Sequence, residues 1–122
     1  MPAPRAIDYD CPIRDVLDRI GDAWTVLVVF KLRQGAWRFN ALCREIEGIS
    51  PRMLTVTLRR LERDGLVKRT ILDTSPPQVE YALTQRGLSL HEAVHVLGRW
   101  AEENQAGIRK ARAAFDQAQE GV

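Results

Sequence analysis

Apolar side chains recur at three- and four-residue spacing over much of the chain, which is the period of a helix packed on one face. The first stripe begins after Pro12, ends before Gly21, and consists of Ile13, Val16, Leu17 and Ile20. A second segment, from Asp22 as cap to Gly35, is apolar on nearly every side, so a buried strand competes with a helix there. We favour a central core helix, because good helix formers follow Phe30 and the two caps suit its ends.

Two further helices are predicted, separated by a tight turn. The first spans residues 40–47, with Asn40 as candidate cap and an apolar stripe of Leu42, Cys43 and Ile46. Ser50-Pro51 then forms a strong start signal, since serine caps helices well and proline suits the first helical position. This second helix should span residues 51–64, with Gly65 as its C-terminal cap. Its buried side is formed by Leu54, Leu58 and Leu61.

After this helix the apolar period changes to two, which predicts β-strands. Residues 66–72 and 79–83 are the two predicted strands, and the turn at 73–78 contains two prolines. Thr84 is a candidate cap for a long last helix. The apolar stripe of that helix is Leu90, Val94, Leu97 and Ala101. We expect a break near Gly107 and a helical tail beyond it.

Helix, turn, helix and hairpin in this order predict a winged helix-turn-helix. The expected fold class is α+β, mainly α, with a two-stranded wing and a long C-terminal dimerisation helix. Residues 1–10 are expected to form a mobile arm, residues 11–105 the winged domain, and residues 106–122 the helical tail. The segment Trp37-Arg38-Phe39 is expected to be a short extended link.

Composition excludes several classes of protein. The chain has 122 residues, of which 45% are hydrophobic and 28% charged, as in an ordinary single globular domain. Two cysteines are too few for a disulfide scaffold. The longest apolar run, 23–30, cannot cross a bilayer, which takes about 20 residues in a helix. Without an apolar signal core near the N-terminus, we expect a cytoplasmic protein that binds no membrane.

Charge is unevenly distributed along the chain. Residues 31–86 carry eleven basic and six acidic side chains, a net charge of +5, whereas 1–30 and 87–122 carry −2 and −1. Within 51–64, the side opposite the apolar stripe carries Arg52, Val56, Arg59 and Arg63. Such a helix can pack on a core and face the phosphates of a polyanion at the same time.

The start of this helix is expected to reach base edges in the major groove of DNA. Ser50, Arg52, Thr55 and Val56 are the candidates for that role, since arginine can bond guanine through two donors. Arginines further along the helix are expected to contact phosphates. The full predicted DNA-binding set is Ser50, Pro51, Arg52, Thr55, Val56, Arg59, Arg60, Arg63, Lys68 and Arg69. The alternative is an ordinary solvated arginine-rich face.

The sequence also resembles a known family through residues spread from 11 to about 100. These are Cys11-Pro12, Gly21-Asp22-Ala23-Trp24-Thr25, Gly35, Arg38-Phe39, Leu42, Gly48-Ile49-Ser50, Leu54, Leu58-Arg59, Leu61-Glu62, Asp64-Gly65-Leu66-Val67, Arg69, Pro76-Pro77, Val79-Glu80-Tyr81, Leu83-Thr84, Gly87 and Trp100. In order and spacing they resemble the HxlR-type winged helix-turn-helix transcriptional regulators of bacteria. Ala41 and Ile71 depart from the family pattern, and residues 105–122 fall outside it.

The resemblance implies a homodimer, built from the first and last helices, that binds a pseudo-palindromic operator in double-stranded DNA. The predicted interface residues are Ile13, Val16, Leu17, Leu90, Val94, Leu97 and Trp100. A two-fold dimer doubles the base contacts of one small module. The alternative is that the last helix only completes the core of a monomer. The expected function is a dimeric regulator, more precisely a repressor, that responds to an oxidant, an electrophile or a small ligand.

Cys11 is the candidate sensor. It directly precedes Pro12, and a helix N-terminus favours the thiolate, although Asp8 and Asp10 oppose it by their charge. The family resemblance implies that a cysteine at this place can react with oxidants, quinones or aldehydes. The alternative is an unreactive buried side chain. Cys43 lies on a core stripe and is expected to be inert.

His91-Glu92-Ala93-Val94-His95 matches the zincin pattern, in which two histidines on one helix face bind zinc. A small zinc-dependent hydrolase is therefore one alternative function. Against it, the chain has only two histidines, and no cleft-forming sheet is predicted around them. A winged-helix module that binds protein is another alternative. We predict no enzyme, no catalytic residue, no metal and no cofactor; an effector pocket near Trp24 or Trp100 is compatible with the sequence.

Overall fold

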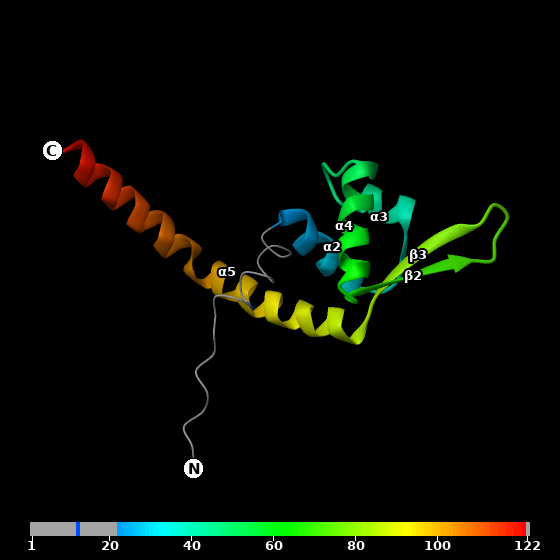
Figure 1. Cartoon of the computed structure of the whole chain (residues 1–122). Coiled ribbons are helices and arrows are strands. Elements are labelled where there is room, and N and C mark those ends of the chain that lie inside the picture. The colour runs from blue at the N-terminus through cyan, green and yellow to red at the C-terminus, as the bar shows by residue number, and fades with distance from the viewer. Residues whose placement is uncertain (1–11, 13–21, 122) are drawn as a thin grey trace, which may run out of the picture.

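The computed structural model of the protein describes Pro12 and residues 22–121. Its helices and strands are α2 (Ala23–Arg33), β1 (Trp37–Arg38), α3 (Phe39–Glu45), α4 (Pro51–Arg63), β2 (Val67–Leu72), β3 (Gln78–Leu83) and α5 (Gln85–Glu120) (Figure 1). The predicted arm over 1–10 and the predicted helix beyond Pro12 lie outside the described residues. Cys11 and the predicted interface residues Ile13, Val16 and Leu17 lie there too.

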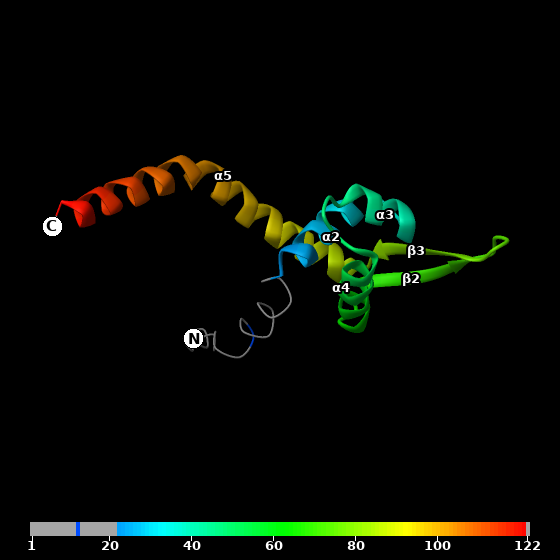
Figure 2. The same cartoon turned by 90° about the horizontal axis from the view of Figure 1, so that it is seen from above.

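Three helices and a hairpin gather at one end of the longest helix. In Figures 1 and 2, α2, α3 and α4 form a group beside the beginning of α5, where α2 packs against α5, and the β2–β3 hairpin projects from this group. The second half of α5 extends away in the opposite direction. One apolar core holds the group together, and it consists of Val28, Val29, Leu32, Leu42, Ile46, Ile49, Leu54, Leu58, Leu61, Leu66 and Val67.

The predicted hairpin is confirmed, but the sheet has a third strand. β2 and β3 pair antiparallel from Val67–Leu83 to Leu72–Gln78, and β1 pairs with the other edge of β3 through Trp37–Tyr81 and Arg38–Glu80. The extended conformation predicted for this segment is confirmed at Trp37 and Arg38, whereas Phe39 already begins α3, and the pairing with β3 was not predicted. A two-residue strand is too short to show an alternating pattern, and only its partner strand defines it.

Three predicted helix starts are confirmed by hydrogen bonds to the cap side chain. The Asp22 carboxylate accepts from the Trp24 amide at 2.9 Å, the Ser50 hydroxyl accepts from Met53, and the Thr84 hydroxyl accepts from Gly87, the last two at 3.1 Å. At the end of α4, Asp64 is the C-cap and Gly65 follows with a φ of 74°, a conformation that favours glycine.

The predicted cap of α3 was wrong. Arg38, rather than Asn40, is the N-cap, and it makes no side-chain capping bond. Arg38 is held in extended conformation by its pairing in the sheet, so the helix begins with Phe39 directly after β1. The helix also ends at Glu45, two residues earlier than expected, with Ile46 as its C-cap.

The predicted break in the last helix was wrong as well. α5 continues through Gly98 and Gly107 for 36 residues, a length of about 54 Å. One glycine costs a helix about 1 kcal/mol relative to alanine, and strong helix formers surround Gly107. The prediction of a helical tail is confirmed. Within the described part of the chain, none of the helices is long and apolar enough to cross a membrane.

Candidate nucleic-acid interface

Helix α4 has an inner and an outer face, as its sequence predicts. Leu54, Leu58 and Leu61 are at most 1% exposed, and Thr57 joins them with its hydroxyl donating to the Met53 carbonyl at 2.9 Å. The opposite face is exposed and carries Arg52, Val56, Arg59 and Arg63. The apolar face seats the helix on the core, so the cationic face is presented to solvent in a defined orientation.

The beginning of α4 presents a small mixed surface. Pro51 and Arg52 are exposed, and Thr55 is half-buried with its hydroxyl donating to the Pro51 carbonyl at 2.8 Å. That bond uses the hydroxyl proton of Thr55, which leaves its oxygen as an acceptor. Met53, 41% exposed beside Val56 at 40%, belongs to the same surface. Met53 was not predicted as part of this surface, because an isolated apolar side chain carries no signal for nucleic-acid contact.

The arginines along the rest of α4 differ in their surroundings. Arg60 approaches the cap of α2, with Nη1 at 4.0 Å from Oδ2 of Asp22. Both side chains are partly exposed, so this ion pair contributes little to stability. Arg59 instead lines a hollow of about 260 Å³ together with Thr55, Glu62, Arg69 and Tyr81. Of the predicted phosphate contacts, Arg59 and Arg69 are therefore brought together.

Lys68 and Arg69 do not share one surface. They are neighbours on β2, so their side chains leave opposite faces of the sheet. Arg69 lies opposite Tyr81 in the register and faces α4, where it lines the hollow, whereas Lys68 lies opposite Ala82. Both side chains are exposed. Only Arg69 therefore extends the cationic face of α4 onto the wing.

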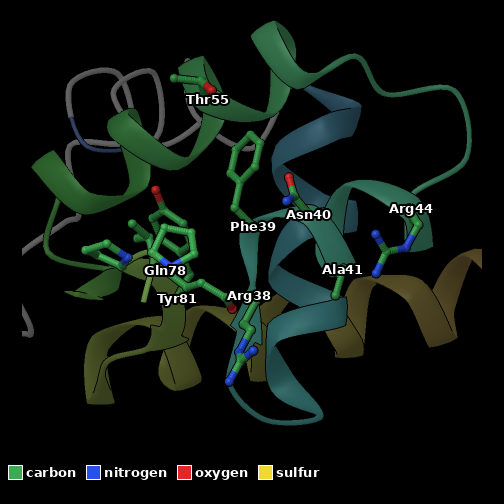
Figure 3. A pocket seen from close by; sticks show the side chains of 11 residues that line it. Arg38, Phe39, Asn40, Ala41, Arg44, Thr55, Gln78 and Tyr81 are labelled. Carbon is green, nitrogen blue, oxygen red and sulfur yellow. The ribbon is translucent and has the colours of Figure 1, made fainter. Parts of the chain in front are cut away.

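A larger hollow of about 670 Å³ lies between α3, the start of α4 and strand β3. Figure 3 looks into it: Phe39 lies between Thr55 and Arg38, with Tyr81 and Gln78 on one side and Asn40 and Arg44 on the other. Its complete lining is Arg38, Phe39, Asn40, Ala41, Arg44, Thr55, Pro76, Pro77, Gln78, Val79 and Tyr81. The polar residues from β1 and α3 were not predicted as site residues, although they lie in the basic middle segment of the sequence.

This architecture can be compared with known proteins. The HxlR-like helix-turn-helix family matches residues 19–108. The chain belongs to this family. Its sequence is 41% identical over 107 residues to the HTH-type transcriptional regulator YtfH of Escherichia coli, covering 85% of each chain. The resemblance found in the sequence is thereby confirmed.

Solved structures of similar regulators share the fold of this chain. The redox regulator HypR in its reduced form superposes with a TM-score of 0.75 at 37% identity, covering 81% of this chain and 98% of HypR. The reduced form of the transcriptional regulator YodB of Bacillus subtilis superposes with a TM-score of 0.70 at 31% identity, covering 76% of this chain and 92% of YodB. This HxlR-family chain is therefore a DNA-binding transcriptional regulator with a winged helix-turn-helix, and the expected fold class is confirmed.

The predicted interface residues on α5 of this HxlR-family protein fall into two groups. Val94 is 7% exposed, and Leu90 packs against the core of the same chain. Leu97 and Trp100 are 58% and 55% exposed. The stripe thus completes the monomer core at its beginning and leaves an apolar surface further along the helix.

The two histidines lie together on α5. The rings of His91 and His95 stack at 5.9 Å, and Phe30 meets His91 edge-on at 5.0 Å. Burial lowers the pKa of His91, the positive charges of Arg33 and His95 lower it further, and Glu92 opposes them. Among the described residues, no three His, Cys, Asp or Glu side chains gather as a metal site would require.

Cys43 occupies the place expected for an inert thiol. It is half-buried beside the core, and its thiol donates to the Ile49 carbonyl at 3.9 Å. That contact ties α3 to the turn before α4. Cys11, the candidate sensor, is outside the described residues.

Proposed function

We propose that this HxlR-family regulator binds a pseudo-palindromic operator as a homodimer and represses transcription. The start of α4 enters the major groove, where Ser50, Arg52, Thr55 and Val56 face base edges, while Arg59 and Arg63 contact phosphates. The exposed cationic face opposite a fully buried leucine stripe on α4 is the observation that carries this proposal. Repression follows from occupancy alone, since an operator that overlaps a promoter excludes the polymerase.

The remaining predicted residues have supporting roles in this proposal. Pro51 fixes the helix start, while Arg60, Lys68 and Arg69 add backbone contacts from α4 and the wing. The exposed apolar surface at Leu97 and Trp100 supports the homodimer, because a second copy would remove it from water. The cytoplasmic location expected from the sequence stays a prediction.

Arg52→Gln tests the recognition role of α4. Losing a two-donor contact to guanine should weaken operator binding by about 1–3 kcal/mol, or about 5- to 150-fold, and relax base preference at one position of each half-site. The measurement is anisotropy titration of the DNA upstream of the protein's own gene, with footprinting of the complex. The parent should protect two half-sites about 10 base pairs apart.

Arg109→Gln is the matched control, since it removes the same charge from exposed α5 far from α4. It should bind the operator as the parent does. Equal affinities of Arg52→Gln and the parent would contradict the recognition role. A parent that binds no duplex would instead favour the protein-binding alternative.

We further propose that modification of Cys11 changes operator affinity. The support is the position of Cys11 before Pro12 and the kinship with HypR, described as a redox regulator. YodB also has a diamide-treated form. The thiolate attacks a ring carbon of a quinone, so that one sulfur–carbon bond forms while a ring carbon–carbon π bond breaks. The π electrons move to a carbonyl oxygen, which takes a proton from water, and loss of the proton on the attacked carbon leaves a hydroquinone thioether. This adduct would bias the dimer toward one arrangement.

The Cys11→Ser variant tests this role. Benzoquinone should weaken operator binding by the parent about 5- to 150-fold, the usual range of allosteric coupling, and leave Cys11→Ser unaffected. Cys43→Ser is the control and should respond as the parent does, since the Cys43 thiol is half-buried and hydrogen-bonded. Should Cys11→Ser and the parent respond alike, the sensor is another group. The readout is the anisotropy titration above.

A further inference from the structure

The two hollows beside α4 share two of their lining residues. Thr55 of α4 and Tyr81 of β3 line both of them. From this shared point the smaller hollow runs toward Arg59 and Arg69, and the larger one is lined by side chains of β1 and α3. We call the two together the inter-groove channel, which separates the recognition helix from the wing.

Several arginines line the channel, and among the described residues none of these has an ion-pair partner. Arg38 and Arg44 line its α3 end, and within the described residues neither forms a salt bridge. Glu80 lies opposite Arg38 in the strand register, yet no ion pair joins them. Glu45 next to Arg44 is engaged by Lys31 at 3.6 Å. The guanidinium groups of both arginines are therefore free for an anionic ligand.

The floor of the channel is aromatic. The rings of Phe39 and Tyr81 lie 6.5 Å apart and tilted by 54°. Figure 3 places Phe39 in the middle of the hollow, with Asn40 and Arg44 to one side. An apolar floor flanked by guanidinium and amide donors suits a chain of sugars linked by phosphates, because the sugars offer apolar surface and the phosphates accept hydrogen bonds.

The position of the channel favours one ligand. When a recognition helix lies in the major groove and a wing reaches the neighbouring minor groove, a sugar–phosphate strand separates the two grooves. That strand must cross between α4 and the wing, which is where the channel runs. The same strand would meet Arg59 and Arg69 at one end and the α3 side chains at the other.

We propose that the inter-groove channel holds this sugar–phosphate strand, and that Arg38, Asn40 and Arg44 bind its phosphates. The inference rests on the proposed DNA binding and extends it to residues of β1 and α3. Arginine and asparagine side chains are common donors to phosphate oxygens. These contacts carry no base information, so they add affinity equally for operator and non-operator DNA.

The double variant Arg38→Gln/Arg44→Gln tests the channel on two duplexes, one of mixed sequence and one from upstream of the gene. Each lost phosphate contact reduces the slope of log affinity against log salt by about 1, so the double variant should lose about 2. Affinity at low salt should fall by the same factor on both duplexes. The measurement is fluorescence anisotropy over a salt series.

Two matched variants show whether an effect comes from the lost charge, from its position in the channel or from a change in structure. Arg109→Gln/Arg112→Gln makes the same change in net charge on exposed α5 and should keep the slope of the parent. Arg38→Lys/Arg44→Lys should keep most of the parent's slope of log affinity against log salt, since lysine also binds phosphate, as a point charge. Because Arg38 makes no capping bond, its replacement should leave α3 folded, which circular dichroism checks.

Each outcome decides a separate question. A parent slope retained by Arg38→Gln/Arg44→Gln would overturn the channel proposal and leave DNA binding through α4 intact. An equal loss in the lysine variant would overturn it too, because it would show a structural role. A parent that binds neither duplex would refute the proposed function, and the channel proposal with it.

Discussion

Replacing Gly87 with alanine is expected to lower the free energy of unfolding by about 3 kcal/mol, at the upper end of overpacking effects. A β-carbon on Gly87 would overlap the Leu66 carbonyl oxygen and lie 3.0 Å from Cδ2 of Leu83. The Leu66 carbonyl cannot retreat freely, because it accepts a hydrogen bond from the Thr84 amide at 3.0 Å. The first turn of α5 would have to move away from the end of α4. Urea denaturation measures the change.

Gly98→Ala and Gly107→Ala are the matched controls on the same helix. No atom of the described residues lies within 4 Å of a β-carbon at either position. Alanine there should raise the free energy of unfolding by up to about 1 kcal/mol, since it favours the helix over glycine. If Gly87→Ala were as stable as the parent, the close contact between α5 and Leu66 would be wrong.

Leu58→Ala is expected to lower the free energy of unfolding by about 2–5 kcal/mol. The side chain is 1% exposed in the core beneath α4, and its removal leaves a cavity that neighbouring side chains fill only in part. Urea denaturation checks this change too. Where the variant is still folded, its affinity for operator DNA should stay near that of the parent, because Leu58 faces away from the DNA.

Val56→Ala, two residues earlier, should show the opposite pattern. Val56 is 40% exposed, so its truncation should change stability by less than about 0.5 kcal/mol. The same change should weaken operator binding, since the proposed recognition surface would bring Val56 to a thymine methyl group. A similar loss of stability in both variants would mean that the inner and outer faces of α4 are assigned wrongly.

Much of the local structure could be predicted from the sequence. Ser50 and Pro51 define the start of α4, and its apolar and cationic faces follow from helical spacing alone. The hairpin and the helix caps at Asp22 and Thr84 also depend on residues that are close together in the sequence. Each of these features depends on residues a few positions apart, and so the chain itself carries the whole signal.

Other features depend on contacts between distant residues, and only the tertiary structure decided them. β1 exists because Trp37 meets Tyr81 across the sheet, and this pairing moves the start of α3 to Phe39. The continuity of α5 through Gly107 is different, because it is a local feature that was predicted wrongly: helix-forming neighbours outweigh one glycine.

The candidate interface also has a part that could be predicted from the sequence and a part that only the tertiary structure decided. Arg52, Arg59 and Arg63 could be placed on one face from the sequence, because a single helix carries them. Arg38 and Arg44 could not be joined to Arg59 and Arg69, because the four elements that carry them come together only when the core packs. The sequence by itself therefore determined α4 and its two faces, because helical spacing depends only on residues close together in the chain. The tertiary structure decided which cations of other elements lie beside α4, because packing brings together residues that are far apart in the sequence.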